Sequence, residues 1–451
     1  MALVDATRTT AHLKTICRAL ASRPLASTMV LHKPADMNEV SAILAQTGAA
    51  FEAVPEEAAR SVITRARLKE CPGTAVAYIS CEIEPEVSQL RGIDPSLVRP
   101  LLPALRIKPQ EYATIPIGDM GWIAPVEVAV ELFAAQPQVS EWGFRHLIAV
   151  LERSGRRVLW GSTRMTTAPP DAPCGGQDPA ITTQSRVLAL VPHYRCEQWL
   201  EQCLHSLTSQ TRAPDNIVVV DDDSPEPPRE IVQRFPEVTL LSTRVNIGPE
   251  NILHDVIRTT DYDAYLVQDA DDWCTADRLE HTLLEAERTG AEVVGAQVIR
   301  SVVDRPEIIL QTHPLDVNRS LSQNIRHCMC HGTSLTARSL ALRSGGFDRT
   351  LHLTADTDFI LRALHLGRMV NLPGFYYYRR MRPDSRTSAS NTGHGSAIRI
   401  KEKDFIYRRA QRNREFEGAG IAPEVVVPEG SPPTDFRHIL GPKLRNISKL
   451  R

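Results

Sequence analysis

The most regular hydrophobic pattern of the chain lies between residues 187 and 273. Residues 187–191 are an unbroken apolar run, which is typical of a strand covered on both faces in a parallel sheet. Two more apolar runs follow at 217–220 and 265–267, and residues 197–209 carry apolar positions at helical spacing between the first two runs. The pattern predicts alternating strands and helices, which is the order of a doubly wound α/β unit.

The second and third of these strands end in acidic turns, DDDS and QDADD. Ligands of doubly wound sheets bind at the carboxyl ends of strands, and clustered acids there need a cation or hydrogen-bond donors to offset their charge. Asp269 and Asp271 offer hard oxygen ligands suited to Mg²⁺ or Mn²⁺ bridging a diphosphate. Asp221 and Asp222 are better suited to accept hydrogen bonds from a base or ribose. Alternatively, these acids are solvated turn formers.

Further motifs occur in a fixed order along the same stretch. They are Pro192-His193-Tyr194-Arg195, the helical set Leu200, Leu204, Ser206, Leu207 and Gln210, then Asp222-Asp223-Ser224, Asn246-Ile247-Gly248 and Asp269-Ala270-Asp271. The ordered set resembles the GT-A glycosyltransferases, in particular the family-2 group of inverting enzymes, over residues 185–390. Arg195 stands where that family usually has Asn.

This resemblance implies a GT-A fold and metal-dependent, inverting transfer of a sugar from a nucleotide-diphosphate donor, with a UDP-sugar expected. The acceptor would be a hydroxyl of a glycan or glycoconjugate, in polysaccharide or glycoconjugate synthesis. Asp269 and Asp271 would hold Mn²⁺ or Mg²⁺. The donor site would include Pro192, Tyr194, Asp221, Asp222, Asn246, Asp269 and Arg382.

The resembling enzymes carry an acidic pair before a helix, and one of its carboxylates acts as general base. Here Ala355 replaces the first acid, so the base is assigned to Asp356, with Asp358 as the second candidate. Arg362 is expected to pair with Asp358 across the helix predicted at 360–366. Alternatively, the acid caps that helix.

Two other segments of this region invite interpretation. The aromatic run 376–378 leads into clustered arginines, which suits a loop closing on a diphosphate through Arg382, or an edge strand with a solvated basic end. The sequence HCMCH at 327–331 has residue types that bind zinc, but its alternation on an extended segment points them to opposite faces. A segment entering the acceptor site is therefore favoured over a zinc site.

Residues 1–165 read as a second doubly wound α/β unit. Helices are expected at 13–20, 38–47, 56–69, 94–101 and 142–155, with strands at 27–31, 51–54, 74–79 and 158–160. With the motifs at 45–49, 93–98 and 126–128, this order resembles the cytidylyltransferase-like proteins that activate acidic sugars. The chain is expected to begin after the phosphate-binding loop of that family, and Glu82 and Glu84 stand in place of its metal-binding acids. A degenerate domain for packing, dimerisation or acceptor binding is favoured.

The remaining segments complete the predicted layout. Residues 166–184 are rich in Pro, Gly and Thr, which predicts an extended, mobile linker before a GT-A domain at 185–398. Residues 399–451 are predicted to form a helical, basic extension. Leu440, Leu444 and Ile447 would share one helical face that could touch anionic lipid, although a solvated or self-packing tail is favoured.

Composition narrows the class of protein. With 52 Lys and Arg against 54 Asp and Glu, the chain is too balanced for a dedicated nucleic-acid binder. Nine cysteines without a framework predict reduced thiols. With neither a signal peptide nor a membrane-spanning run, we expect a cytoplasmic protein, at most peripheral to a membrane. A homo-oligomer is left open.

Two other functions fit the same sequence. One is a bifunctional enzyme in which residues 1–165 activate a sugar with CTP. The other is a non-catalytic scaffold built on two decayed domains. The sugar and the acceptor are not readable from the sequence.

Overall fold

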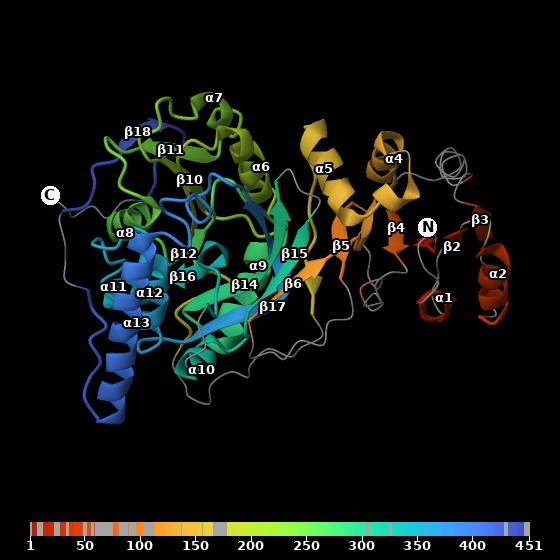
Figure 1. The fold of residues 1–451 in the computed structure, drawn as a ribbon. Coiled ribbons are helices and arrows are strands. Elements are labelled where there is room, and N and C mark those ends of the chain that lie inside the picture. The colour runs from red at the N-terminus through yellow and green to blue at the C-terminus, as the bar shows by residue number, and fades with distance from the viewer. Residues whose placement is uncertain are drawn as a thin grey trace. The chain divides into compact units, whose positions relative to one another are not determined.

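The computed structural model describes residues 2–6, 12–21, 28–32, 36–47, 52–55, 58, 75–80, 89, 96–102, 112–136, 138–155, 157–165, 178–303, 307–323, 327–427 and 432–445. The chain folds into two compact units (Figure 1). The first comprises Met1–Arg106, Pro116–Met165 and Asp304–Ile308, and the second comprises Ile107–Ile115, Thr166–Val303 and Ile309–Arg451.

The first unit is built on a sheet of strand order β3-β2-β1-β4-β7-β5. Its parallel strands are β1 (Ala2–Asp5), β2 (Thr28–His32), β3 (Glu52–Pro55) and β4 (Ala75–Ser80). The antiparallel strands are β7 (Gly121–Pro125) and β5 (Arg99–Leu101). The helices are α1 (Leu13–Ala21), α2 (Met37–Ala45), α4 (Val126–Ala135), α5 (Phe144–Ser154) and the 3-10 turn η4 (Val139–Glu141).

Several expectations for this unit need correction. The chain was expected to begin after the first strand and its loop, but β1 precedes α1 and pairs with both β2 and β4. The helix predicted at 94–101 is wrong, because Arg99–Leu101 is a strand. Trp160 forms an isolated bridge with Val98 rather than part of a strand. The helix predicted at 56–69 and the acids Glu82 and Glu84 lie outside the described residues, apart from Ala58.

The second unit has the strand order β13-β17-β14-β16-β12-β9-β10-β11-β18, and β15 pairs with β14. Its parallel core consists of β12 (Ala264–Val267), β9 (Val187–His193), β10 (Asn216–Asp221) and β11 (Val238–Ser242). The other strands of this sheet are β13 (Trp273–Cys274), β14 (Val293–Val302), β15 (Ile308–Thr312), β16 (Leu335–Ala337), β17 (Met369–Met381) and β18 (Arg437–Leu440). Outside these lists are β6 (Ala113–Ile117), whose residues are divided between the two units, and β8 (Thr163–Arg164), whose residues belong to the first unit.

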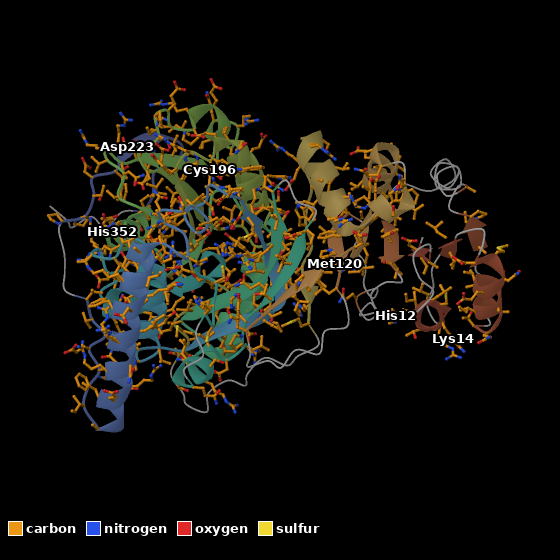
Figure 2. All side chains as sticks on the ribbon, viewed as in Figure 1. His12, Lys14, Met120, Cys196, Asp223 and His352 are labelled. Carbon is orange, nitrogen blue, oxygen red and sulfur yellow. The ribbon has the colours of Figure 1, made fainter. Side chains whose placement is uncertain are left out.

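Helices connect the strands of the second unit. They are α6 (Glu197–Thr208), α7 (Arg229–Val232), α8 (Pro249–Thr259), α9 (Arg278–Thr289), α10 (Val317–Ser322), α11 (Arg338–Arg343), α12 (Ala355–Ala363) and α13 (Ala397–Gly418), with the 3-10 turn η5 (His331–Thr333). The predicted strands and helix of the 187–267 stretch are confirmed as β9, α6, β10 and β12. Nearly every residue of these strands is buried, which explains their unbroken apolar runs. By contrast, Asp223 in the turn after β10 is exposed (Figure 2).

The two ends of the second unit differ from the predicted layout. The predicted linker is too long, because Ile181 is fully buried in the hydrophobic core of this unit; residues 166–177 lie outside the described residues. The proposed start of a separate extension at 399 falls inside α13, whose Ile406 belongs to the same core. The helical face that would include Leu440 is wrong, because Arg437–Leu440 forms β18 and pairs antiparallel with β11; Ile447 lies outside the described residues. Among the helices that the structure describes, none combines the length and the apolar character needed to cross a bilayer.

Candidate active site

A cavity of about 1120 Å³ lies within the second unit, where β9, β10 and β12 end. Residues from all the predicted motifs except the helical set at 200–210 line it: Pro192, Tyr194, Asp222, Asn246, Asp269, Asp271, Asp356 and Arg382. Asp221 does not line it and has no exposed surface. The structure thus brings the three acidic segments, far apart in sequence, to one cavity.

The turn that carries Asp269 is held by a buried arginine. Arg278, from the first turn of α9, donates to the Gln268 side chain at 2.7 Å, to the Val267 carbonyl at 2.8 Å and to the Gly332 carbonyl at 3.2 Å. Gly332 itself must lack a side chain, since a Cβ there would lie 2.8 Å from Asp269 Oδ2. Sequence reasoning missed both residues, because neither belongs to an acidic motif.

Asp269 presents a carboxylate suited to a cation. Burial, and next the charge of Asp271, raise the pKa of Asp269 to about 6. Among the described residues, no donor is hydrogen-bonded to this carboxylate. A divalent cation would remove the repulsion between the two acids, so the donor set fits the metal that the sequence predicts. The described residues do not supply a group of three or more His, Cys, Asp or Glu for a metal, so the remaining ligands would come from substrate or water.

Asp271 is shared with an arginine. Arg382 Nε donates to Asp271 Oδ2 at 2.7 Å, and the neighbouring Asp272 accepts from the Arg380 amide at 2.7 Å. The Arg380 guanidinium lies 3.9 Å from the ring centre of Trp199 and 4.9 Å from that of Trp273, and donates to the Asp271 carbonyl. These contacts fix the acidic turn against β17.

The acids after β10 organise another part of the site. Asp222 accepts from the amides of Ile247 and Gly248, each at 2.8 Å, while the Asn246 side chain donates to the Asp222 carbonyl. Burial raises the pKa of Asp222, and these amides partly offset the rise. Asp221 lies 2.9 Å from His193 Nδ1 and accepts from the Ser224 amide. Asp222 therefore faces the cavity while holding the 246–248 turn, and Asp221 supports the end of β9.

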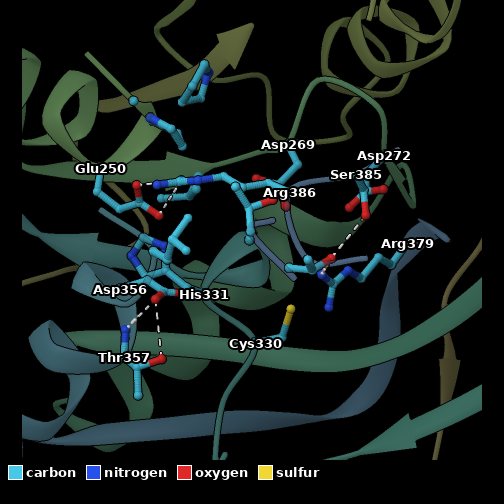
Figure 3. A pocket seen from close by; sticks show the side chains of 18 of the residues that line it. Glu250, Asp269, Asp272, Cys330, His331, Asp356, Thr357, Arg379, Ser385 and Arg386 are labelled. Atoms are coloured by element: carbon cyan, nitrogen blue, oxygen red, sulfur yellow. Dashed lines mark hydrogen bonds and ion pairs between the residues drawn. The ribbon is translucent and has the colours of Figure 1, made fainter. Parts of the chain in front are cut away.

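The two candidate bases have different surroundings. Asp356, in the first turn of α12, lines the cavity, and its carboxylate accepts from the amide of Thr357 at 2.6 Å (Figure 3). Asp358 is 1 % exposed and is paired with Arg362 at 2.8 Å and with Arg409. The predicted pairing of Arg362 with Asp358 is confirmed. Of the two, Asp356 is the carboxylate that a substrate can reach.

Other cavity residues were not predicted. Glu250, one residue after the Asn-Ile-Gly-Pro motif, is paired with Arg386 at 2.7 Å. Burial raises the pKa of Glu250, whereas the charge of Arg386 lowers it. In Figure 3, Glu250 and Asp356 lie on one side of the cavity and Arg379 lies on the other, with Cys330 between them.

The HCMCH segment lines the cavity as a wall. Burial raises the pKa of Cys328 to about 12 and that of Cys330 to about 11, so both thiols are protonated at neutral pH. The segment therefore lines the candidate site, and its expected role at the acceptor stays a prediction.

Comparison with known families decides the class of the second unit. Residues 189–345 match the model of the family described as glycosyl transferase family 2. The second unit carries a glycosyltransferase family 2 domain. An uncharacterized glycosyltransferase of Haemophilus influenzae is 26% identical over 193 residues, which cover 41% of this chain and 71% of that protein. The uncharacterized glycosyltransferase EpsJ of Bacillus subtilis is 24% identical over 218 residues, which cover 45% of this chain and 62% of that protein.

Solved structures include similar chains. The crystal structure of S. aureus TarS 1–349 in complex with UDP aligns with a TM-score of 0.37 at 19% identity, covering 51% of this chain and 72% of that one. The same protein in complex with UDP-GlcNAc aligns with a TM-score of 0.39 at 18% identity, covering 51% and 73%. The resemblance of the first unit to cytidylyltransferase-like proteins stays a prediction.

The local structure explains two residue positions in the motifs of the glycosyltransferase domain. Gln210 donates to the Ser206 and Thr275 carbonyls and accepts from the Leu279 amide, so it joins α6 to the start of α9. Arg195 has φ of 49°, in the left-handed region that Asn tolerates better than most residues. The Asn that the family usually has at this position suits this backbone.

Proposed function

We propose that the second unit transfers a sugar from a nucleotide-diphosphate donor, expected to be a UDP-sugar, to a hydroxyl group with inversion of the anomeric centre. The observation that supports the proposal most is the meeting of Asp269, Asp271 and Asp356 in one cavity. Two of these acids suit a cation-bound diphosphate, and the third suits deprotonation of an acceptor hydroxyl.

In the proposed reaction, the acceptor oxygen forms a bond to the anomeric carbon while the bond from that carbon to the diphosphate oxygen breaks. Asp356 takes the hydroxyl proton as the new bond forms. When bound, Mn²⁺ or Mg²⁺ neutralises the charge that develops on the leaving diphosphate, and Asp269 with Asp271 would hold it. Arg382, now paired with Asp271, is close enough to this turn to donate to a phosphate oxygen once a cation takes its place.

Two variants separate the roles of the acids. Asp271→Asn should reduce turnover by about 100-fold or more and weaken UDP binding in Mn²⁺ by roughly 10-fold or more, because it removes a metal ligand. Asp356→Asn should reduce turnover by about 10²–10⁴-fold and leave UDP affinity unchanged, because the base does not contact the nucleotide. Donor hydrolysis with a panel of nucleotide sugars and calorimetry with UDP and Mn²⁺ measure the two effects.

Asp404→Asn is the matched control, since Asp404 lies on the exposed side of α13 and outside the cavity. Wild-type turnover in both site variants would refute these assignments. A wild-type protein that gives no metal-dependent heat with UDP would instead favour a non-catalytic scaffold.

A further inference from the structure

One part of the cavity is lined by cations rather than acids. Arg300 of β14 and Arg379 of β17 are register partners on adjacent parallel strands, and both side chains line the cavity. Paired residues on neighbouring strands project from the same face, and like charges in such positions repel each other. A sheet that keeps two arginines side by side needs an anion to offset them.

Carboxylates lie near Arg379, whereas among the described residues none acts on Arg300. Burial lowers the pKa of Arg379, whereas Cys330, Asp272 and Asp269 together raise it above the ordinary value. Burial and the charge of Arg379 both lower the pKa of Arg300, and no carboxylate is among the groups that act on it. Arg300 Nε is buried without a hydrogen-bond partner among the described residues. Arg300 is half-buried, and a cation with a buried, unpartnered nitrogen is stabilised by an anion, so this side chain is placed for a ligand.

Other basic residue types lie around the arginine pair. His313, His327, His394 and Lys403 line the same cavity. Burial lowers the pKa of His394 to about 4, and the charges of Lys403, Arg399, Arg379 and His327 contribute. Burial likewise lowers the pKa of His313 to about 4, with the charges of His327, Arg300 and Arg379 adding to the effect.

Three other arginines of the cavity are already engaged within the protein. Arg386 is paired with Glu250, and Arg399 donates to the Thr392 carbonyl at 2.8 Å. Arg382 is paired with Asp271. Arg300 is not engaged in this way. In the sheet, β17 lies between β13 and β14, so Arg379 separates Arg300 from the acidic turn at 269–272 that precedes β13.

We propose that Arg300, with Arg379 beside it, binds a carboxylate or phosphate of the substrate that is additional to the donor diphosphate. This rests on the proposed function, because it assumes that the diphosphate occupies the Asp269–Asp271 end of the cavity. A planar guanidinium donates two parallel hydrogen bonds to either anion. The anion belongs to the transferred sugar, as in a uronic acid, or to the acceptor, as in a phosphorylated glycan.

The test uses the full chain with UDP and Mn²⁺ at saturation, so that the diphosphate site is filled. Glucuronate and glycerol 3-phosphate are the anionic probes, and glucose and glycerol are their neutral counterparts. Wild type should bind at least one anion in preference to its neutral counterpart, and Arg300→Met should weaken that binding by about 10-fold or more. UDP affinity should stay within about twofold in this variant. Arg234→Met, a surface variant outside the cavity, is the control.

Thermal melting separates a binding role from a structural one. Arg300→Met should melt at the same or a higher temperature, because it removes repulsion from Arg379 without breaking an ion pair. A lower melting temperature with anion binding unchanged would make Arg300 structural and overturn the proposal. Failure of wild type to bind either anion while it binds UDP would overturn it too. The protein could also bind the anion through Arg300 but show no metal-dependent binding of UDP in calorimetry. That result would support the anion subsite and refute the proposed function.

Two comparisons of substrates identify whether the anion belongs to the donor sugar or to the acceptor. A wild-type preference for UDP-glucuronate over UDP-glucose that Arg300→Met removes assigns the anion to the donor sugar. A preference for phosphorylated over neutral acceptors, with one neutral donor, assigns it to the acceptor. Absence of both preferences in an active enzyme would contradict the subsite.

Discussion

The two units share the order of their parallel strands but differ in what those strands carry at their carboxyl ends. The order is β3-β2-β1-β4 in the first unit and β11-β10-β9-β12 in the second. In the first unit, β1 ends at Asp5, which is buried and accepts from the Tyr78 hydroxyl at 2.5 Å. In the second, β12 runs into Asp269, whose carboxylate lacks such a donor among the described residues. The strand order alone therefore does not create a binding site. A binding site also needs polar groups that line a cavity and have no hydrogen-bond partner in the protein.

The sharpest way to test this contrast is to add one methyl group to a glycine in each unit. Gly332→Ala places a Cβ 2.8 Å from Asp269 Oδ2 and 3.1 Å from the Tyr377 hydroxyl. It should displace the carboxylate and weaken UDP binding in Mn²⁺ by about 100-fold. Gly121→Ala places a Cβ against the Tyr78 carbonyl of the first unit. It should destabilise that unit and leave UDP binding unchanged, and calorimetry together with hydrogen exchange reads out both effects.

Nucleotide binding that survives Gly332→Ala would mean that Asp269 does not need its present position. Loss of binding in Gly121→Ala would mean that the first unit contributes to the site. Either outcome would break the contrast drawn between the units.

Lowering the pH should destabilise the second unit through protonation of His313. Its pKa of about 4 lies below the ordinary value of 6.5, because the buried ring accepts a charge poorly. The neutral ring therefore stabilises the second unit above pH 6.5, and this contribution, on the order of 3 kcal/mol, is lost as the pH falls to 4. In the first unit, burial raises the pKa of Cys17 to about 11, so this thiol does not titrate in acid.

Because Asp269 titrates near pH 6 with the opposite sign, the comparison must be between wild type and His313→Gln at each pH. Wild type should lose more stability than the variant between pH 6.5 and 4, as measured by urea unfolding followed by hydrogen exchange. Parallel pH profiles of the two proteins would contradict a neutral, buried His313.

The smallest effect is expected from Tyr78→Phe in the first unit. The change removes a donor to the buried Asp5 carboxylate and should cost about 1–2 kcal/mol of that unit's stability. Turnover in the second unit should not change, because the hydrogen bond is satisfied within the protein. Sugar transfer that falls with this substitution would show that the first unit takes part in the reaction.

The sequence predicted the second unit well where patterns are local. Unbroken apolar runs located β9, β10 and β12. Of the predicted acids that follow them, Asp222, Asp269 and Asp271 line the cavity, whereas Asp221 does not. It failed where the reason is long-range. Arg437–Leu440 forms a strand because β11 offers a free edge, although its apolar spacing also suits a helix.

The site was predicted in part for the same reason. Asp269, Asp271 and Asp356 stand out as acids in turns, whereas Arg300 is an unremarkable position of a strand. The proposed role of Arg300 depends on its register with Arg379. Arg379 lies 79 positions later in the chain, and the two residues become neighbours only in the folded sheet. Asp358 was the second candidate base, and only the fold places Arg409 of α13 beside it.

The pairing of β18 with β11 has a consequence for how the protein can be made and handled. Until residues 437–440 have left the ribosome, the backbone groups of β11 have no partner on that side, so the nascent second unit carries an open edge through most of its synthesis. A fusion or cut placed before Arg437 would leave this edge open permanently and invite association between copies. Expression vectors should therefore retain this strand.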